Sequence, residues 1–213
     1  MSKYVINVSF NTRVNKTIRS LEIAESFGLG LDEKAWTLYD NLELDIERGD
    51  VVYVTGQSGS GKSVVLRELQ RLMADAGQRV ASIDDFVFAD DTNVIDQLGK
   101  TTSDALGLLS MAGLNDAYLF VRKPSEMSDG QKYRLKIAKL IESGADVWVA
   151  DEFGAVLDRV TAQVVASNLQ RAARAVGATV IVATTHEDLK NALRPSVQIT
   201  KHYKERVKVD YEH

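Results

Sequence analysis

Apolar residues follow two patterns that alternate along the chain from about residue 50 onwards. Continuous apolar runs over 146–150 and 179–184 are bounded by polar or turn residues, which is typical of strands buried on both faces of a parallel sheet. The β-branched run 51–55 and the short segment 79–83 also predict strands. Apolar spacings of three or four predict helices, one ending near Ala76, one from about Ser103 with that hydroxyl as its cap, one over 129–142 and one over 159–176. The pattern therefore predicts an α/β fold with a mainly parallel core sheet flanked by helices.

The first 50 residues carry a different pattern. Segments 3–10 and 18–23 alternate roughly between apolar and polar positions, which predicts two antiparallel strands. A loop-rich stretch, 24–40, follows them. Segment 42–47 predicts another strand, which the turn 48–50 joins to the 51–55 strand. We therefore expect an antiparallel β-subdomain at the N-terminus.

Length and composition limit the class of protein. The 213 residues are 45% hydrophobic and 26% charged, which fits one globular domain with a full core. The net charge of −4 gives no argument for binding nucleic acid or an anionic membrane. Neither a long apolar run nor a secretory leader is visible, so we expect a soluble, cytoplasmic protein without a transmembrane segment. The absence of cysteine excludes disulfides and thiolate metal sites.

Eight residues from Gly56 to Ser63 read G-x-x-x-x-G-K-S, between the 51–55 strand and a helical pattern. Its glycines allow positive φ, so that successive N–H groups can turn inward and bind an anion at a helix N-terminus. Lys62 would reach the β- and γ-phosphates of a nucleotide, and the Ser63 hydroxyl would join a Mg²⁺ shell. The sequence thus predicts a P-loop nucleoside-triphosphatase fold. The residues expected to bind the nucleotide here are Gly56, Gln57, Ser58, Gly59, Ser60, Gly61, Lys62, Ser63 and Val64.

An acidic pair, Asp151 and Glu152, follows the buried run that ends at Ala150. The carboxyl ends of parallel strands are where such sheets bind ligands, so Asp151 is expected to hold Mg²⁺. Glu152 would then orient and deprotonate a water that attacks the γ-phosphate. Taken alone, the pair also fits an ordinary acidic pair near a helix after a strand.

Three further segments follow in a recognisable order. Residues 127–131 read M-S-D-G-Q before a helix, residues 155–158 read A-V-L-D, and residues 183–186 read A-T-T-H. Together with the phosphate loop and the acidic pair, they resemble the signature, D-loop and switch-histidine motifs of ATP-binding-cassette (ABC) ATPases. By itself, the M-S-D-G-Q segment is also explained as the capped start of a helix.

The resemblance assigns a role to each motif. It implies ATP and Mg²⁺ as cofactors, and a head-to-tail homodimer in which ATP lies between the phosphate loop of one subunit and the signature of the other. Asp158 would lie across the same interface, and His186 would contact the γ-phosphate. The signature residues expected to bind ATP are Ser128, Asp129, Gly130 and Gln131. The expected catalytic residues are Glu152, His186 and Lys62.

The resemblance also implies an aromatic residue early in the fold that stacks on adenine. Phe27 lies in a Ser-Phe-Gly segment that resembles this position, and we take it as the candidate. Trp36 and Tyr39 are alternatives. All three residues could instead belong to the core.

The chain departs from the family pattern at three places. The segment between Lys62 and Ser128 is short, which predicts a reduced helical subdomain and weakens the case for a transporter subunit. The family's glutamine after the 79–83 strand is replaced by Asp84 and Asp85. Asp84 is therefore a candidate Mg²⁺ ligand, with a turn-forming acidic pair as the alternative and Gln97 as a weaker candidate for the missing glutamine. Phe153 stands where the family usually has proline.

These motifs divide the chain into functional parts within a single ABC-type ATPase domain. We expect residues 1–50 to form the antiparallel part with the nucleotide-base loop, 51–83 and 143–200 the P-loop core, 84–142 the reduced helical and signature region, and 201–213 a C-terminal strand or tail. The basic segment 201–208 fits a solvated edge strand, with nucleic-acid contact as the alternative.

The resemblance supports three functions. The favoured one is a compact, soluble ABC ATPase that acts on an unknown macromolecular partner, similar to ABC-type ATPases associated with a predicted acetyltransferase domain. The alternatives are a nucleotide-binding subunit of a membrane transporter, and an ATP-dependent binding switch in DNA maintenance with low turnover.

Overall fold

A computed structural model describes residues 2–203 and 205–212 of the chain. It contains two compact units. The larger unit comprises the first few residues and the chain from Leu44 onwards, and the smaller one comprises Val5–Glu43.

A six-stranded sheet forms the centre of the larger unit, with strand order β4-β5-β6-β3-β7-β8. Neighbouring strands are parallel except for β8, which pairs antiparallel with β7. The strands are β3 (Val51–Thr55), β4 (Val80–Ser82), β5 (Val147–Ala150), β6 (Thr179–Thr184), β7 (Val197–Thr200) and β8 (Lys208–Tyr211). The predicted parallel core sheet is therefore confirmed, and β3, which leads into the phosphate loop, lies inside it.

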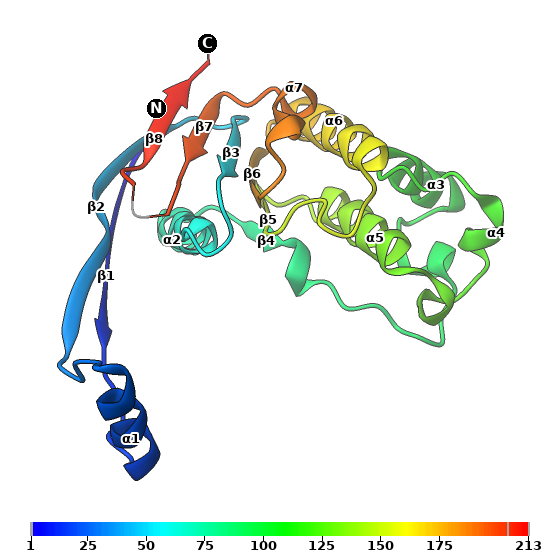
Figure 1. The fold of residues 1–213 in the computed structure, drawn as a ribbon. Helices are drawn as coiled ribbons and strands as arrows, with labels where there is room; N and C mark the ends of the chain where they lie inside the picture. The colour runs from blue at the N-terminus through cyan, green and yellow to red at the C-terminus, as the bar shows by residue number, and fades with distance from the viewer. Residues whose placement is uncertain (1, 204, 213) are drawn as a thin grey trace. The chain divides into compact units, whose positions relative to one another are not determined.

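Helices cover both faces of this sheet (Figure 1). Helix α2 (Lys62–Asp75) contacts one face, and α5 (Asp129–Glu142), α6 (Arg159–Val176) and α7 (Lys190–Leu193) lie on the other. Alternate strand residues share one buried cluster with apolar side chains of α5 and α6: Val51, Tyr53, Trp148, Ala150, Val180 and Val182. Because successive side chains of a strand point to opposite faces, the residues between them face α2. This explains why β3, β5 and β6 are continuous apolar runs.

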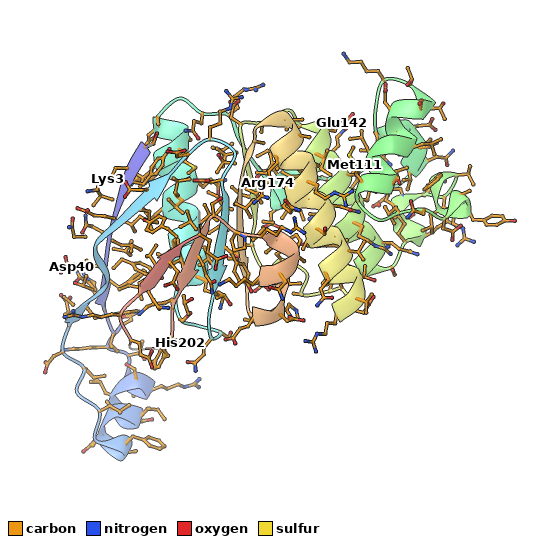
Figure 2. All side chains as sticks on the ribbon, turned by 90° about the horizontal axis from the view of Figure 1, so that it is seen from above. Lys3, Asp40, Met111, Glu142, Arg174 and His202 are labelled. Carbon is orange, nitrogen blue, oxygen red and sulfur yellow. The ribbon has the colours of Figure 1, made fainter. Side chains whose placement is uncertain are left out.

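The segment between β4 and α5 consists of short elements. It contains η1 (Ile83–Asp85), η2 (Val94–Gln97), α3 (Thr102–Met111), α4 (Ala117–Phe120) and η3 (Pro124–Glu126). Glu142 at the end of α5, labelled in Figure 2, accepts hydrogen bonds from the Gly99 backbone N–H (2.7 Å) and the Lys139 ammonium (2.7 Å). The bond from Gly99 ties the segment to α5, and the bond from Lys139 holds the Glu142 carboxylate in place.

The N-terminal prediction is partly wrong. The smaller unit is built from β1 (Ser2–Thr12), α1 (Ile18–Phe27) and β2 (Lys34–Ile46), and β1 and β2 form an antiparallel two-stranded sheet. Segment 18–23 is therefore helix rather than strand. Thr17 caps this helix through a reciprocal pair of hydrogen bonds with Ser20, and Gly28 ends it at φ 62°. Such capping favours a helix over the weak strand pattern.

Three smaller predictions also need correction. The stretch 24–40 is not mainly loop, because α1 extends to Phe27 and β2 begins at Lys34. Helix α3 is capped by Thr101, whose hydroxyl accepts from the Asp104 N–H (3.2 Å), and Ser103 lies inside it. Lys201 is buried, and its ammonium donates to the backbone carbonyl of Glu205, so the basic segment 201–208 is not a uniformly solvated strand. Across the residues that the structure describes, no helix is both long enough and apolar enough to span a bilayer.

Candidate functional site

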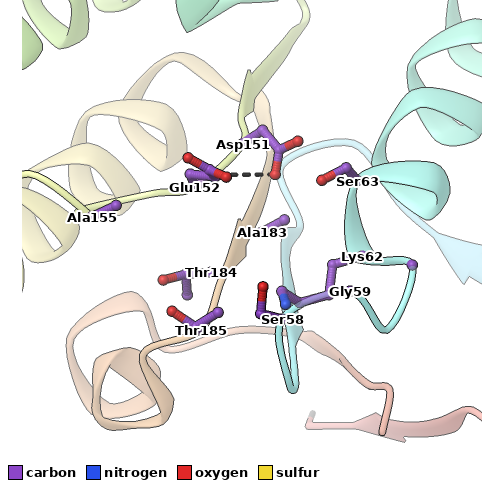
Figure 3. Close-up of a pocket in the computed structure, with 11 residues that line it drawn as sticks. Ser58, Gly59, Lys62, Ser63, Asp151, Glu152, Ala155, Ala183, Thr184 and Thr185 are labelled. Atoms are coloured by element: carbon purple, nitrogen blue, oxygen red, sulfur yellow. Dashed lines mark hydrogen bonds between the residues drawn. The ribbon is translucent and has the colours of Figure 1, made fainter. Parts of the chain in front are cut away.

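A pocket of about 540 Å³ opens at the carboxyl ends of β3, β5 and β6 (Figure 3). Its lining comes from the phosphate loop with the first turn of α2, from the turn after β5, and from the end of β6. The lining residues are Ser58, Gly59, Gly61, Lys62, Ser63, Asp151, Glu152, Ala155, Ala183, Thr184 and Thr185. The carboxyl edge of a parallel sheet is the usual place for ligand binding in such folds.

The phosphate loop takes the conformation that its glycines predict. Gly56 has φ 138° and Gly61 has φ 102°, and Gly61 is the residue immediately before α2. The first N–H groups of a helix have no partner within the helix, and the helix dipole places partial positive charge there. The loop therefore presents an anion-binding helix N-terminus to the pocket.

The Lys62 ammonium lies over the loop. It donates hydrogen bonds to the carbonyl oxygens of Gly56 (2.9 Å) and Gln57 (2.7 Å). Burial lowers the pKa of Lys62, and the negative charges of Asp151 and Glu152 act in the opposite direction. An anionic ligand in the pocket would favour the charged ammonium in the same way as these carboxylates.

Ser63 and Asp151 both place side-chain oxygens in this pocket. Figure 3 shows the two side chains facing each other across it. No cluster of three or more His, Cys, Asp or Glu side chains suited to a metal ion occurs in residues 2–203 and 205–212. This donor set fits Mg²⁺, which proteins often hold through one or two side-chain oxygens together with substrate phosphates rather than in an all-protein cage.

Glu152 has an unusual backbone conformation. It is one of the few non-glycine residues with positive φ, at 47°, and its N–H donates to the Asp151 carboxylate (2.9 Å; Figure 3). A left-handed conformation of this kind costs about 1–3 kcal/mol and is found preferentially at functional sites. The Glu152 side chain is exposed on the wall of the pocket, where a carboxylate can accept a proton from water.

His186 follows the two threonines that line the pocket but is not itself among the lining residues. Its backbone N–H donates to the Thr184 hydroxyl (3.1 Å), and its carbonyl accepts from the Tyr53 hydroxyl. The backbone of His186 is thereby held at the edge of the pocket. Its side chain is only partly exposed.

The signature residues Ser128 to Gln131 and Asp158 of the D-loop do not line the pocket, although Ala155 at the start of the D-loop does. Ser128 is the N-cap of α5: its hydroxyl accepts from the Gln131 N–H (3.3 Å), and its own N–H donates to the Gln131 amide oxygen (2.9 Å). Asp158 caps α6 by accepting from the Thr161 N–H (2.9 Å), and the hydrogen bonds from Thr161 lower the pKa of Asp158. Both segments are exposed helix N-termini, and a Cβ on Gly130 would be 3.2 Å from the carbonyl oxygen of Val156 in the D-loop.

Asp84 occupies the position after β4 that Asp151 occupies after β5, since Ser82 pairs with Val149. Its side chain is exposed but does not line the pocket. The Asp85 carboxylate accepts from the Ser82 N–H (2.9 Å) and so stabilises the turn.

Gln97 has a local structural role. Its amide bonds to the backbone of Ala89 through both its oxygen and its nitrogen, and its nitrogen also donates to the Thr92 carbonyl (2.8 Å). These bonds hold the loop before η2 and occupy the amide. They argue against Gln97 as a replacement for the missing glutamine.

The three adenine-stacking candidates differ in exposure within the smaller unit. Phe27 is 72% exposed at the end of α1, and Trp36 is 49% exposed with its ring stacked on Phe10 at 5.2 Å. Tyr39 is only 2% exposed. A ring that receives a base must be accessible, so Phe27 fits this role better than either alternative.

Five residues of the site were named within motifs of the sequence but were given no role there. Thr184, Thr185, Ala183 and Ala155 line the pocket, and Phe153 anchors the turn that carries Glu152 through a hydrogen bond from its N–H to the Ala183 carbonyl (2.8 Å). The A-T-T-H segment at 183–186 marked the position of the two threonines, and A-V-L-D at 155–158 marked that of Ala155. The backbone bond of Phe153 leaves no signal in the sequence pattern.

Comparisons with known proteins agree with this geometry. A sequence model of the family described as "ABC transporter" matches residues 39–155. The methionine import ATP-binding protein MetN 2 of Rhodococcus jostii (strain RHA1) is 28% identical, and the match covers 85% of this chain and 62% of that protein. The aliphatic sulfonates import ATP-binding protein SsuB 2 of the same organism is 31% identical, with 76% of this chain and 72% of that protein covered. The chain spans less than two thirds of the length of methionine-import relatives that it matches.

The fold has solved counterparts. A dimeric structure of a post-hydrolysis state of the ATP-binding cassette MJ0796 bound to ADP and Pi has a TM-score of 0.68 and 18% sequence identity, and the match covers 97% of this chain and 98% of that one. The fold is therefore that of an ABC cassette. With more than half of its length matched by the family and a phosphate loop and acidic pair in one pocket, the chain belongs to the ABC transporter family of ATP-binding, ATP-hydrolysing domains.

Proposed function

We propose that this chain hydrolyses ATP as a head-to-tail homodimer in which each ATP contacts both subunits. The main supporting observation is the division of the site: the pocket contains the phosphate loop and the acidic pair, whereas Ser128 and Asp158 lie outside it at exposed helix N-termini. Such termini are suited to bind a phosphate. The signature of one subunit is therefore free to meet the ATP held by its partner. The dimeric structure of the MJ0796 cassette bound to ADP and Pi supports the proposal of a dimer.

The residues of the pocket divide the chemistry between them. The amides of the loop and the Lys62 ammonium bind the phosphates and stabilise the charge that develops during transfer. Glu152 accepts a proton from the attacking water, whose oxygen bonds to the γ-phosphorus as the bond to ADP breaks. His186 is proposed to contact the γ-phosphate and to keep Glu152 in register. The backbone contacts of His186 with Thr184 and Tyr53 would fix its position.

Mg²⁺ is the metal that the site fits. Ser63 and Asp151 would hold it, and Asp84 is a more distant candidate because it follows the neighbouring strand without lining the pocket. When bound, the ion neutralises phosphate charge. We propose a cytoplasmic location, where ATP is supplied.

We propose two alternatives for the process that ATP hydrolysis drives. The short segment between Lys62 and Ser128 supports a soluble macromolecular partner, as in compact ABC-type ATPases that are associated with a predicted acetyltransferase domain. The names of the relatives support a second candidate, a nucleotide-binding subunit of an import system. A DNA-maintenance switch with low turnover has less support, because Glu152 and Lys62 lie in one pocket suited to hydrolysis.

Two experiments test the proposal. Wild-type protein should release phosphate from ATP in the presence of Mg²⁺, EDTA should stop the release, and Lys62→Ala should abolish both ATP binding and release. Lys100→Ala, at an exposed lysine away from the pocket, is the matched control and should behave as wild type. Retention of ATP binding and turnover by Lys62→Ala would refute the assignment of the phosphate loop.

The second experiment distinguishes a soluble macromolecular partner from a membrane transporter. Glu152→Gln protein held with ATP is used as bait, and the captured proteins are identified. A multi-span membrane protein retained only with ATP would support the transporter subunit, whereas a soluble protein or nucleic acid retained in the same way would support the first proposal.

A further inference from the structure

The turn that carries Glu152 needs support from outside itself. Glu152 has φ 47° and Gly154 has φ 77°, so two of the three residues 152–154 have left-handed backbone conformations. The conformation at Glu152 is unfavourable for a residue with a side chain and persists only when surrounding contacts hold it. Contacts from two other elements do so.

The first contact comes from the helix that begins at the signature. The hydroxyl of Tyr133, on α5, accepts a hydrogen bond from the Gly154 N–H (3.1 Å). Its ring meets the ring of Phe153 edge to face, with centroids 6.1 Å apart and planes at 70°. Burial raises the pKa of Tyr133, so its hydroxyl stays neutral over the working pH range. Tyr133 therefore touches both residues that follow Glu152.

The second contact comes from the sheet. Phe153 is fully buried, and its N–H donates to the carbonyl of Ala183 on β6 (2.8 Å). A proline at position 153 has no N–H to donate, and it restricts the preceding residue to extended conformations. The left-handed Glu152 and the Phe153 hydrogen bond are thus compatible with phenylalanine here and incompatible with proline.

We propose that Tyr133 is a positioning residue that fixes Glu152 through Gly154 and Phe153. Within one subunit, Tyr133 thereby links the helix that begins at the signature to the turn that carries the catalytic carboxylate. Ser128 lies at the start of the same helix, so Tyr133 connects the helix that would meet the partner's ATP with the turn that carries Glu152. The inference rests on the proposed roles of Glu152 and Ser128.

Tyr133→Phe tests this inference, because it removes the acceptor for the Gly154 N–H and keeps the ring against Phe153. We expect kcat for ATP hydrolysis to fall about tenfold, as the loss of one buried hydrogen bond allows, while KM and the Kd for ATP stay within about twofold. Tyr118→Phe, which removes the hydroxyl of an exposed tyrosine on α4, is the matched control and should retain wild-type kcat. Unchanged kcat in Tyr133→Phe, or a rise in KM without a fall in kcat, would overturn the proposal.

A double variant tests whether Tyr133 affects the rate by positioning Glu152 or by stabilising the protein in general. Because Tyr133 is proposed to act through Glu152, Tyr133→Phe should lower the residual rate of Glu152→Gln by less than about twofold. A further tenfold loss would mean that Tyr133 acts independently of Glu152, which contradicts the proposal. Wild-type protein without ATPase activity would instead refute the proposed function itself.

A second site gives an independent check. Phe153→Leu loses the ring contact with Tyr133 but keeps the N–H to Ala183, so it should lower kcat less than Phe153→Pro, which also removes the N–H and should lower kcat at least tenfold with KM for ATP unchanged. Equal rates for these two variants would contradict the role assigned to the turn.

Discussion

The carbonyl oxygen of Lys201 occupies the space that a side chain at Gly56 would need. A Cβ added to Gly56 would be 1.8 Å from that oxygen, far inside van der Waals contact. The Lys201 N–H also donates to the carbonyl of Thr55 (2.9 Å), so the chain beyond β7 runs directly against the start of the phosphate loop. Position 56 therefore requires glycine for steric reasons as well as for its φ of 138°.

Gly56→Ala should destabilise the protein more than Gly59→Ala. Both glycines have positive φ, but a Cβ on Gly59 would meet nothing within 4 Å. Gly59→Ala is then expected to cost about 1–2 kcal/mol from backbone conformation alone, and Gly56→Ala at least about 3 kcal/mol because a backbone segment must also move. Thermal unfolding without nucleotide measures both. If Gly56→Ala and Gly59→Ala lowered Tm by the same amount, Lys201 would not constrain the loop.

Phe27→Ala should weaken ATP binding through the base. Stacking of a base on an aromatic ring contributes about 1–3 kcal/mol, so the Kd for ATP should rise about tenfold while the Kd for inorganic triphosphate stays unchanged. Calorimetric titration measures both constants. Trp36→Ala is the control, since that ring is already stacked on Phe10. A larger effect of Trp36→Ala than of Phe27→Ala would transfer the role to Trp36.

Mixing two inactive variants should restore part of the activity. Lys62→Ala damages the phosphate loop and Ser128→Ala damages the signature, so a mixed head-to-tail dimer has one intact site. An equimolar mixture should hydrolyse ATP at about a quarter of the wild-type rate, because half of randomly formed dimers are mixed and each has one of two sites intact. Phosphate release measures the rate.

The control is an equimolar mixture of the Lys62→Ala protein and the Glu152→Gln protein. Both changes affect residues that line the same pocket, so no mixed dimer gains an intact site and no activity should return. Recovery in the control, or none in the first mixture, would contradict the head-to-tail arrangement.

The core of the fold could be predicted because its patterns are strong and local. Helix α6 spans Arg159–Val176 as its apolar spacing and the following glycine predict, and β6 spans the apolar run 179–184. The N-terminal region could not be predicted by the same means. Segment 18–23 has a weak period, and the decisive signals for α1 were the capping residue Thr17 and the terminal Gly28.

The pocket itself could be predicted from contiguous motifs. Lys62, Ser63, Asp151 and Glu152 line it together, because strand order brings the ends of β3 and β5 to one edge on either side of β6. Contacts between distant segments could not be predicted. The closeness of Lys201 to Gly56 and the bond from Gly154 to Tyr133 depend on backbone positions that no periodicity encodes.

The central claim is that ATP closes two copies of this chain around a composite site. Light scattering of Glu152→Gln protein measures it most directly, because this variant binds ATP without the carboxylate that deprotonates water. With ATP and Mg²⁺ the molar mass should double relative to the nucleotide-free protein, and adding Lys62→Ala to the same chain should abolish the doubling. A Glu152→Gln protein that remains monomeric over a wide range of ATP concentration, together with wild-type protein that does not hydrolyse ATP, would contradict the account.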